Sequence, residues 1–413
     1  MSGISEYKNK ISPVIIVIAY NREDSLERLL ASLQAADYGQ SQVKLIISID
    51  KSDNDQVAQV AEDFSFSHGS KEVIKRESNM GLFDHVLACS RLAEDYGAAV
   101  ILEDDLLVSE DFYSYACSAL EFSEGRDYIA GVSLYKHLLN VHAREPFEPV
   151  NDGYDGWYFQ FASSWGQAFT AGQWRSFRTW LEKNKEKEID RPVFIKGREY
   201  KGAVPENICS WGSKSWLKYF MRYVIENDKY FLYPQQSRTT NFAAKGTHSM
   251  GQEYDLQVPL SLGKKTDFIF PEREESLSVY DAYFENLSLK ARVIGRLKDM
   301  GIKAGAEDIA IDLYGSRSRE NISSYSYVLS SRAEDRRVLF SYGRLLRPHE
   351  NNIFKDMQGE EFFLYEMGRP GRAPRISKYK KLSYNYRAFK AAYGLDIIRE
   401  RIKTNVWNSG NHK

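Results

Sequence analysis

The chain has 413 residues, a formal net charge of −1, 27% charged residues and 43% hydrophobic residues. This composition is that of an ordinary globular protein, and the near-zero charge excludes nucleic-acid binding driven by a strongly positive whole-protein field. Three cysteines, Cys89, Cys117 and Cys209, are too few and too irregularly spaced for a disulfide framework or a cysteine-ligated zinc site.

The first hundred residues alternate between apolar runs and helical patterns. A continuous apolar, mostly β-branched run over 14–19 is typical of a strand buried on both faces. Leucines at 26, 29, 30 and 33 then follow helical spacing. Strands that alternate with helices predict an α/β fold with a mostly parallel sheet and right-handed crossovers. We expect strands at 14–19, 43–49, 72–75 and 98–102, and helices at 23–33, 57–64 and 83–96.

Polar residues follow three of these strands at the point where each strand ends. Asn21 and Arg22 follow the first strand, Asp50 follows the second, and Glu103-Asp104-Asp105 follows 98–102. Ligands of such sheets bind beyond the carboxyl ends of the strands. The sequence therefore predicts that these side chains converge on one site.

The pattern becomes mixed after residue 128 and the composition changes near residue 270. We interpret 1–270 as the catalytic domain and 271–413 as an appended C-terminal α+β region. In the first part we expect a strand at 129–134, a Gly/Asp/Tyr-rich loop at 151–161, helices at 174–187 and 210–226, a strand at 230–233 and a loop at 238–251. In the second we expect a helix at 280–300, a strand or short helix at 307–314, and a hairpin formed by 327–330 and 337–342.

The acidic triplet Glu103-Asp104-Asp105 has a composition that suits a hard divalent cation. Mg2+ and Mn2+ prefer carboxylate oxygens and need only one or two from a protein when phosphate and water supply the rest. A solvated acidic turn is the ordinary alternative. Apolar residues lead into the triplet and Leu106-Leu107-Val108 leads out of it, so the acids are fixed between buried segments and a Mn2+ or Mg2+ site is favoured.

Several short segments, in order over residues 12 to about 255, resemble a GT-A-fold glycosyltransferase of the bacterial family-2-like kind, similar to the N-acetylglucosaminyltransferase I group. GT-A denotes a Rossmann-like, mostly parallel sheet flanked by helices. Each segment is weak alone, and the resemblance ends near residue 270. The segments are Ile18-Ala19-Tyr20-Asn21-Arg22, Ser48-Ile49-Asp50, Asn79-Met80-Gly81-Leu82, Leu102-Glu103-Asp104-Asp105-Leu106 with Ser109-Glu110-Asp111-Phe112-Tyr113, Ser163-Ser164-Trp165-Gly166, and Ser237-Arg238-Thr239-Thr240-Asn241-Phe242 with Lys245-Gly246-Thr247-His248.

The resemblance implies an inverting, metal-dependent transfer of a sugar from a nucleotide sugar, with a UDP-sugar favoured, to a saccharide or a lipid-linked glycan. It implies that Asp105 binds the metal and that His248 reaches the metal or a phosphate. The alternative role for Asp50 is to cap a helix or turn. The alternative for the other three is that they are plain surface groups: His248, Arg238 and Lys245. The implied donor-site residues are Ala19, Tyr20, Asn21, Arg22, Asp50, Asn79, Gly81, Glu103, Asp104, Arg238 and Lys245, and the implied acceptor residues are Trp165, Gly166 and Trp211.

The resemblance also implies a carboxylate base, but the segment Ile208-Cys209-Ser210-Trp211-Gly212 lacks the aspartate that related sequences carry there. Glu206 is the nearest acid and our candidate base, with Asp152 and Asp155 as further candidates. A loop acid or a helix N-terminal charge is the alternative role for Glu206. Trp157, Trp165 and Trp211 offer rings for sugar stacking, although tryptophan more often packs in a core.

The C-terminal tail from Arg369 carries 12 Lys and Arg against two acids, interleaved with aromatic residues. A basic amphipathic helix over 388–403 would suit peripheral contact with an anionic membrane, and a solvated helix packed on its own protein is the alternative. The polar N-terminal stretch and the lack of any run of about 18 apolar residues lead us to expect a cytoplasmic enzyme. No recognised nucleic-acid-binding module accompanies the basic tail.

Two other functions stay open for this sequence. A sugar nucleotidyltransferase shares the fold, but such enzymes open with a Gly-rich phosphate loop that Ala19-Tyr20-Asn21-Arg22-Glu23 lacks. An inactive GT-A domain that acts as a scaffold or glycan-binding protein is the non-enzymatic alternative, and the missing aspartate near Trp211 keeps it open.

Overall fold

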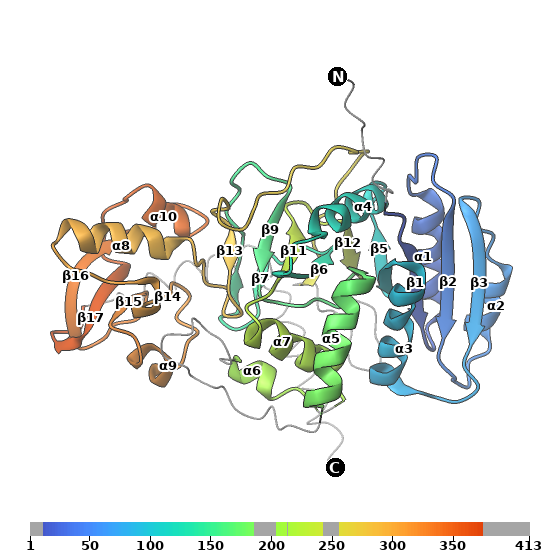
Figure 1. Cartoon of the computed structure of the whole chain (residues 1–413), viewed down its shortest axis with the longest axis horizontal. Coiled ribbons are helices and arrows are strands. Elements are labelled where there is room, and N and C mark those ends of the chain that lie inside the picture. Colours follow the sequence, from blue (N-terminus) through green and yellow to red (C-terminus); the bar gives the residue numbers. More distant parts are fainter. Residues whose placement is uncertain (1–10, 186–203, 213, 243–255, 375–413) are drawn as a thin grey trace, which may run out of the picture.

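The computed structural model describes residues 11–185, 204–212, 214–242 and 256–374, and its centre is a nine-stranded sheet flanked by helices (Figure 1). The strands of this sheet are β1 (Val14–Ala19), β2 (Val43–Ile49), β3 (Gly69–Lys75), β4 (Ala98–Glu103), β6 (Ile129–Ser133), β9 (Gly156–Phe159), β10 (Gln167–Thr170), β11 (Tyr230–Pro234) and β13 (Val279–Tyr280). Their spatial order is β13-β9-β11-β6-β10-β4-β1-β2-β3, and only β9, β10 and β13 run against the others. The predicted α/β fold with a mostly parallel sheet flanked by helices is confirmed.

Helices cover both faces of the sheet because each inner strand is apolar on both sides. Along β1, Ile16 and Ile18 enter one core and Ile15 and Val17 enter the other, as the two-residue period of a strand requires. Helices α3, α5 and α7 contribute to the first core and α1, α2 and α4 to the second. Their bounds are Glu23–Ala35 (α1), Gln56–Asp63 (α2), Gly81–Tyr96 (α3), Phe112–Ser123 (α4), Ala171–Asn184 (α5), Glu206–Cys209 (α6) and Trp216–Glu226 (α7).

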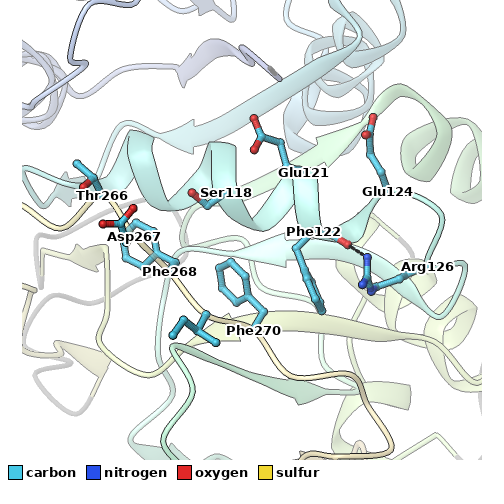
Figure 2. A pocket seen from close by; sticks show the side chains of 10 residues that line it. Ser118, Glu121, Phe122, Glu124, Arg126, Thr266, Asp267, Phe268 and Phe270 are labelled. Carbon is cyan, nitrogen blue, oxygen red and sulfur yellow. Dashed lines mark hydrogen bonds between the residues drawn. The ribbon is translucent and has the colours of Figure 1, made fainter. Parts of the chain in front are cut away.

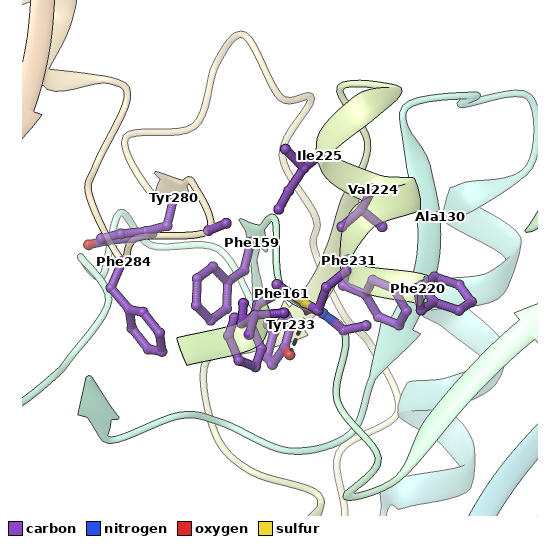
Figure 3. Close-up of a cluster of buried hydrophobic side chains, with 14 of the residues drawn as sticks. Ala130, Phe159, Phe161, Phe220, Val224, Ile225, Phe231, Tyr233, Tyr280 and Phe284 are labelled. Atoms are coloured by element: carbon purple, nitrogen blue, oxygen red, sulfur yellow. Dashed lines mark hydrogen bonds between the residues drawn. The ribbon is translucent and has the colours of Figure 1, made fainter. Parts of the chain in front are cut away.

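Aromatic side chains fill the part of the first core around β9 and β11 (Figure 3). The rings of Phe159 and Phe161 are stacked at 5.2 Å, and the Tyr233 hydroxyl donates to the Phe161 carbonyl. Strand β9 lies in this cluster, so the prediction of a loop over all of 151–161 is wrong for 156–159. The glycine and aspartate content favoured a loop, but pairing with β11 and burial on both faces stabilise a strand there.

Two short antiparallel pairs lie outside the main sheet. One joins β5 (Leu106–Val108) to β12 (Thr239–Asn241), and the other joins β7 (Leu139–Asn140) to β8 (Glu145–Pro146). The predicted loop at 238–251 therefore begins with a strand, and residues 243–255 lie outside the described residues. The predicted helix at 210–226 begins only at Trp216, because the Ser215 side chain caps its N-terminus.

The C-terminal region forms a four-stranded sheet with helices beside it. Two predictions are wrong here: the helix expected from residue 280 begins at residue 289, and the strands at 327–330 and 336–342 do not pair, because a strand at 362–370 lies between them. Strand β13 joins the central sheet, and division into domains at residue 270 stays a prediction. The elements are α8 (Leu289–Asp299), η2 (Ala306–Asp308), β14 (Ile309–Asp312), α9 (Arg319–Ser323), β15 (Tyr327–Ser330), β16 (Arg336–Tyr342), α10 (Glu350–Phe354) and β17 (Phe362–Pro370).

None of the helices in the described part of the chain has the length and apolar character that a bilayer crossing requires.

A buried histidine makes the stability of the fold depend on pH. Within the described residues, neither ring nitrogen of His137 has a hydrogen-bond partner, and the ring packs against Tyr135 and Phe161. Burial, with a smaller effect of His142, lowers the pKa of His137 to about 3. Below pH 6.5 the unfolded chain therefore takes up a proton that the folded chain does not, so the folded state loses stability as pH falls from about 6.5 to about 3.

We predict that His137→Phe removes this loss. Between pH 7 and pH 5 the wild type should lose about 2 kcal/mol more of its unfolding free energy than the variant does. Urea denaturation of both proteins at the two pH values measures the difference. Equal losses in the two proteins would show that His137 is protonated in the folded state at pH 5.

Candidate functional site

The acidic triplet forms the turn between β4 and β5. The parallel pairing of β1 and β4 places Glu103 beside Ile18, and the Asp104 N–H donates to the Ile18 carbonyl at 3.1 Å. On the other side, the Phe242 N–H donates to the Asp105 carbonyl at 2.9 Å, directly after β12. The Asp104 side chain is 3% exposed and that of Asp105 is 22% exposed. Backbone bonds from two neighbouring segments thus fix the backbone of both aspartates at the carboxyl edge of the sheet.

The guanidinium of Arg22 lies between these two carboxylates. Its Nη1 donates to Asp105 Oδ2 at 3.1 Å, and its Nη2 pairs with Asp104 Oδ1. Arg22 precedes α1, and its carbonyl accepts the Leu26 N–H, so the start of the helix fixes its backbone. This pairing was not predicted, although the adjacency of β1 and β4 brings the residues after each strand together.

Burial and the repulsion of neighbouring carboxylates raise the pKa values of Glu103 and Asp104. Burial raises the pKa of Glu103 to about 8, with additional effects of the Asp105 and Asp104 charges. Burial likewise raises the pKa of Asp104 to about 6, against the lowering effect of Arg22. Arg22 itself loses solvation, but the two aspartates outweigh this and raise its pKa. Negative charge is therefore unfavourable in this turn even beside one guanidinium, and a divalent cation would stabilise the ionised carboxylates.

Asp50 holds the start of α3 next to this turn. Its Oδ1 accepts the Met80 N–H at 2.8 Å, and its Oδ2 accepts the Gly81 N–H at 3.0 Å. Asn79 donates to the Lys51 carbonyl at 2.9 Å. These bonds are those of the capping alternative, and a contact of Asp50 with a nucleoside stays a prediction. The structure does bring Asp50, Asn79 and Gly81 together, and the Asp50 N–H bonds to the Ala19 carbonyl of β1.

The predicted acceptor segment lies on the other side of the triplet. The Ser164 side chain lies close enough to the Glu103 carboxyl group to oppose the effect of burial on its pKa, a contact that the sequence did not predict. Trp165 is half-buried, and its carbonyl accepts the Thr239 hydroxyl at 2.6 Å. The Gly166 carbonyl accepts the Leu134 N–H at 3.0 Å. Hydrogen bonds and ion pairs thus join four segments along one edge of the sheet: Ala19 to Arg22, Asp50, Glu103 to Asp105, and Ser164 to Gly166.

Gly166 is required at this edge for two reasons, and we predict a cost for Gly166→Ala. Its φ is +89°, which favours glycine, and an added Cβ would lie 2.7 Å from Thr239 Cγ2. Strain and overlap should lower the unfolding free energy by about 1–3 kcal/mol and loosen the bond between Thr239 and Trp165. Urea denaturation measures the first effect.

Gly172→Ala is the matched control for Gly166→Ala. Gly172 lies in the first turn of α5, and the nearest atom to an added Cβ is 3.9 Å away. Alanine favours a helix over glycine, so this variant should be neutral or up to about 1 kcal/mol more stable. Equal stability of the two variants would contradict the role assigned to Gly166.

The structure does not bring Arg238 to the acidic turn. Its guanidinium is buried, pairs with Asp111 at 3.2 Å and lies over the rings of Tyr115 and Phe268. The Ser109 N–H also donates to the Arg238 carbonyl. The expected contact of Arg238 with the donor diphosphate is therefore corrected: a buried aspartate takes the guanidinium, and Arg238 anchors β12 against the start of α4.

Two of the three candidate bases are held by other segments. Asp155 accepts from Lys265 at 2.5 Å and from the Ile269 N–H, and Asp152 accepts from Ser276 and the Leu277 N–H. Both are thus structural anchors for the chain that follows residue 263. Glu206 is exposed at the first position of α6, and Trp211 is half-buried two residues after it ends.

Trp157 is fully buried in the aromatic core, so it is no stacking surface for a sugar. Lys245, His248 and the basic tail from residue 375 lie outside the described residues, and their roles stay predictions.

Two buried oxygens of the triplet fit a cation. Within the described residues, Asp104 Oδ2 and Asp105 Oδ1 have no hydrogen-bond partner. That part of the chain contains no group of three or more His, Cys, Asp or Glu side chains arranged to hold a metal by themselves. Asp104 and Asp105 therefore fit a hard cation that takes its other ligands from water or from a bound phosphate.

A separate cavity of about 760 Å³ lies beside α4 (Figure 2). Phe122, Phe268 and Phe270 line it, with Glu121 and Glu124 at its border. None of the predicted site residues lines it. We locate the candidate site at the acidic turn, because the unpaired oxygens and the raised pKa values lie there.

Residues 14–158 match the family model described as Glycosyl transferase family 2. The matched segment is about a third of the chain and contains the acidic turn, Arg22, Asp50 and Gly81. This part of the chain is therefore similar in sequence to the family 2 glycosyltransferases. No curated protein matches the chain.

Solved structures resemble the chain only distantly. The mannosyltransferase PcManGT from Pyrobaculum calidifontis, in complex with GDP-Man and Mn2+, is 14% identical, with 54% of this chain and 55% of that chain covered and a TM-score of 0.33. S. aureus TarS 1-349, in complex with UDP-GlcNAc, is 13% identical, with 58% and 60% covered and a TM-score of 0.37. The chain thus spans little more than half the length of these two proteins. The bound GDP-Man, UDP-GlcNAc and Mn2+ are ligands of those two proteins.

Proposed function

We propose that this chain is an inverting, divalent-metal-dependent glycosyltransferase that moves a sugar from a nucleotide sugar, with a UDP-sugar favoured, to a saccharide or lipid-linked glycan. One observation carries the proposal: within the family 2 segment, Asp104 and Asp105 present buried, unpaired carboxylate oxygens at the carboxyl edge of the sheet. The similarity of the sequence motifs to the N-acetylglucosaminyltransferase I group belongs to the same proposal.

Asp105, with Asp104 beside it, would hold Mn2+ or Mg2+. The ion would supply positive charge to the diphosphate leaving group. Backbone bonds on both sides of the turn hold the backbone of the two aspartates in place before any ligand arrives. Tyr20 and Asn21 at the end of β1, and the segment that Asp50 fixes at the start of α3, would border the nucleotide.

The acceptor hydroxyl would attack the anomeric carbon as the bond from that carbon to the diphosphate oxygen breaks, which inverts the configuration. The acceptor proton would pass to a carboxylate. Glu206 is our candidate base, because its side chain is exposed whereas Asp152 and Asp155 bind other segments. Trp165 and Trp211, both half-buried, are the candidate acceptor contacts. Cytoplasmic location and membrane contact of the basic tail belong to the proposal.

Nucleotide-sugar turnover with and without metal tests the proposal. A thermal-shift screen of UDP-sugars and GDP-sugars with Mn2+ identifies the donor, because a ligand that binds only the folded state raises the melting temperature. We expect that donor to release its nucleoside diphosphate with Mn2+ and not with EDTA. Release of pyrophosphate from a nucleoside triphosphate and a sugar phosphate would instead identify a sugar nucleotidyltransferase. Neither binding nor turnover would indicate a non-catalytic scaffold.

A further inference from the structure

The structure pairs Arg22 with the same two carboxylates that the proposed function gives to the metal. Arg22 Nη1 lies 3.1 Å from Asp105 Oδ2, and Nη2 pairs with Asp104 Oδ1. The remaining oxygens, Asp104 Oδ2 and Asp105 Oδ1, are the unpaired ones. Arg22 thus pairs with one oxygen of each carboxylate, and its side chain is 25% exposed.

A divalent cation and this guanidinium are incompatible neighbours. A hard cation on Asp105 would lie within a few ångströms of a permanently charged arginine, and like charges at that distance repel. Without either cation, the buried Asp104 would face Asp105 with no counter-charge, which is costly. Either cation therefore compensates the charge of the same two carboxylates, and the presence of one opposes the other.

We propose that Arg22 holds the Asp104–Asp105 pair in the metal-free protein, competes with the metal for it, and on metal binding moves to the diphosphate of the donor. The inference rests on the proposed function and deepens it. A planar guanidinium matches a phosphate group as well as it matches a carboxylate. A displaced Arg22 would thus exchange one anionic partner for another, so metal and nucleotide would each favour the binding of the other. Arg22 is in this sense a positioning residue.

Binding of Mn2+ alone to the full chain, measured by calorimetry, tests the competition. Arg22→Met should bind Mn2+ about tenfold more tightly than the wild type, and Arg22→Lys, which keeps the charge but loses the fork, should lie between them. Arg28→Met is the matched control. Arg28 lies on α1, and its guanidinium lies over the Phe242 ring, so its loss removes a nearby charge and should change the affinity less than twofold.

A second measurement distinguishes displacement from a merely structural role. With saturating Mn2+, Arg22→Met should bind UDP, or GDP if the wild type prefers it, about tenfold more weakly than the wild type. The variant would then have a higher affinity for Mn2+ and a lower affinity for the nucleotide. General destabilisation of the fold would not change the two affinities in opposite directions. If Arg22→Met fails to fold, Arg22→Lys should show both changes with smaller size.

The possible failures are distinguishable. Mn2+ affinity in Arg22→Met that equals or falls below the wild-type value overturns the competition, provided that Asp105→Asn abolishes Mn2+ binding. Tighter Mn2+ with unchanged nucleotide affinity overturns the transfer of Arg22 to the diphosphate. If wild type and Asp105→Asn bind Mn2+ equally, or neither binds it, the metal site of the proposed function fails, and this inference fails with it.

Discussion

Asp105→Asn is expected to lower the rate of sugar transfer on the order of 10³-fold, about 4 kcal/mol of transition-state stabilisation. An amide cannot supply the negative charge that a divalent cation needs, and Asp105 Oδ1 is a buried oxygen without another partner among the described residues. The rate of nucleoside diphosphate release under saturating donor, acceptor and Mn2+ measures the loss. Activity above a tenth of the wild-type value would contradict the role of Asp105.

The same variant should stay folded, so the activity loss is not a stability loss. The charge of Asp105 raises the pKa values of Glu103 and Asp104, which means that it repels the other acids of the turn. Its removal relieves this repulsion while Asp104 keeps Arg22. The melting temperature without metal should therefore be equal to or above that of the wild type, and the stabilisation by Mn2+ should disappear.

Asp53→Asn provides the control for charge removal near the site. Asp53 is exposed in the loop after β2, next to Asn54, whose side chain bonds to the Asn21 carbonyl. An exposed acid without a fixed partner contributes little to a buried site through water. Transfer by Asp53→Asn should stay within about twofold of the wild type, so a loss similar to that of Asp105→Asn would point to a general field effect.

The N-terminal half of the sheet could be predicted because its signals are local. The strands at 14–19 and 43–49 have the bounds that their apolar runs indicate, and the leucine spacing locates α1. A strand that is buried on both faces needs no knowledge of its neighbours to be recognised. The carboxyl ends of the strands at 43–49 and 98–103 then predict where Asp50 and Asp105 lie.

The errors arose where a distant segment decides the local structure. Strand β9 forms because β11 and β13 pair with it on either side, and its own sequence resembles a loop. The strand that separates β15 from β16 comes from residues 362–370, about twenty residues further along the chain, so the expected hairpin was a reasonable but wrong pairing. Sequence spacing carries no information about such partners.

The site shows the same division. The motif around Arg238 predicts a contact with the donor diphosphate. In the structure its partner is Asp111, which lies 127 residues earlier, and nothing in the sequence near either residue indicates this pairing. Asp50 reaches the start of α3 across a whole helix and strand. The pairing of Arg22 with Asp104 follows from the adjacency of β1 and β4, and that adjacency was implicit in the alternating pattern but not traced to side chains.

Arg317→Met is expected to lower the unfolding free energy by about 3–5 kcal/mol, because it leaves a buried carboxylate without its counter-ion. Arg317 and Asp281 are both fully buried and form an ion pair. Arg317 also donates to the Ile311 carbonyl at 2.8 Å. The pair joins the turn after β13 to the end of β14, so its loss should loosen the C-terminal sheet from the central one. Urea denaturation followed by circular dichroism measures the change.

A second substitution tests whether the unpaired charge is the cause. Asp281→Asn keeps an oxygen for the Tyr283 and Glu285 N–H groups, which Asp281 Oδ1 accepts at 2.8 and 3.1 Å, and removes the charge. Added to Arg317→Met, it should restore about 1–3 kcal/mol. The exposed pair of Arg337 and Glu366 is the control, since Arg337→Met should cost less than about 1 kcal/mol. If the double variant is no more stable than Arg317→Met, the loss does not arise from the unpaired buried charge of Asp281.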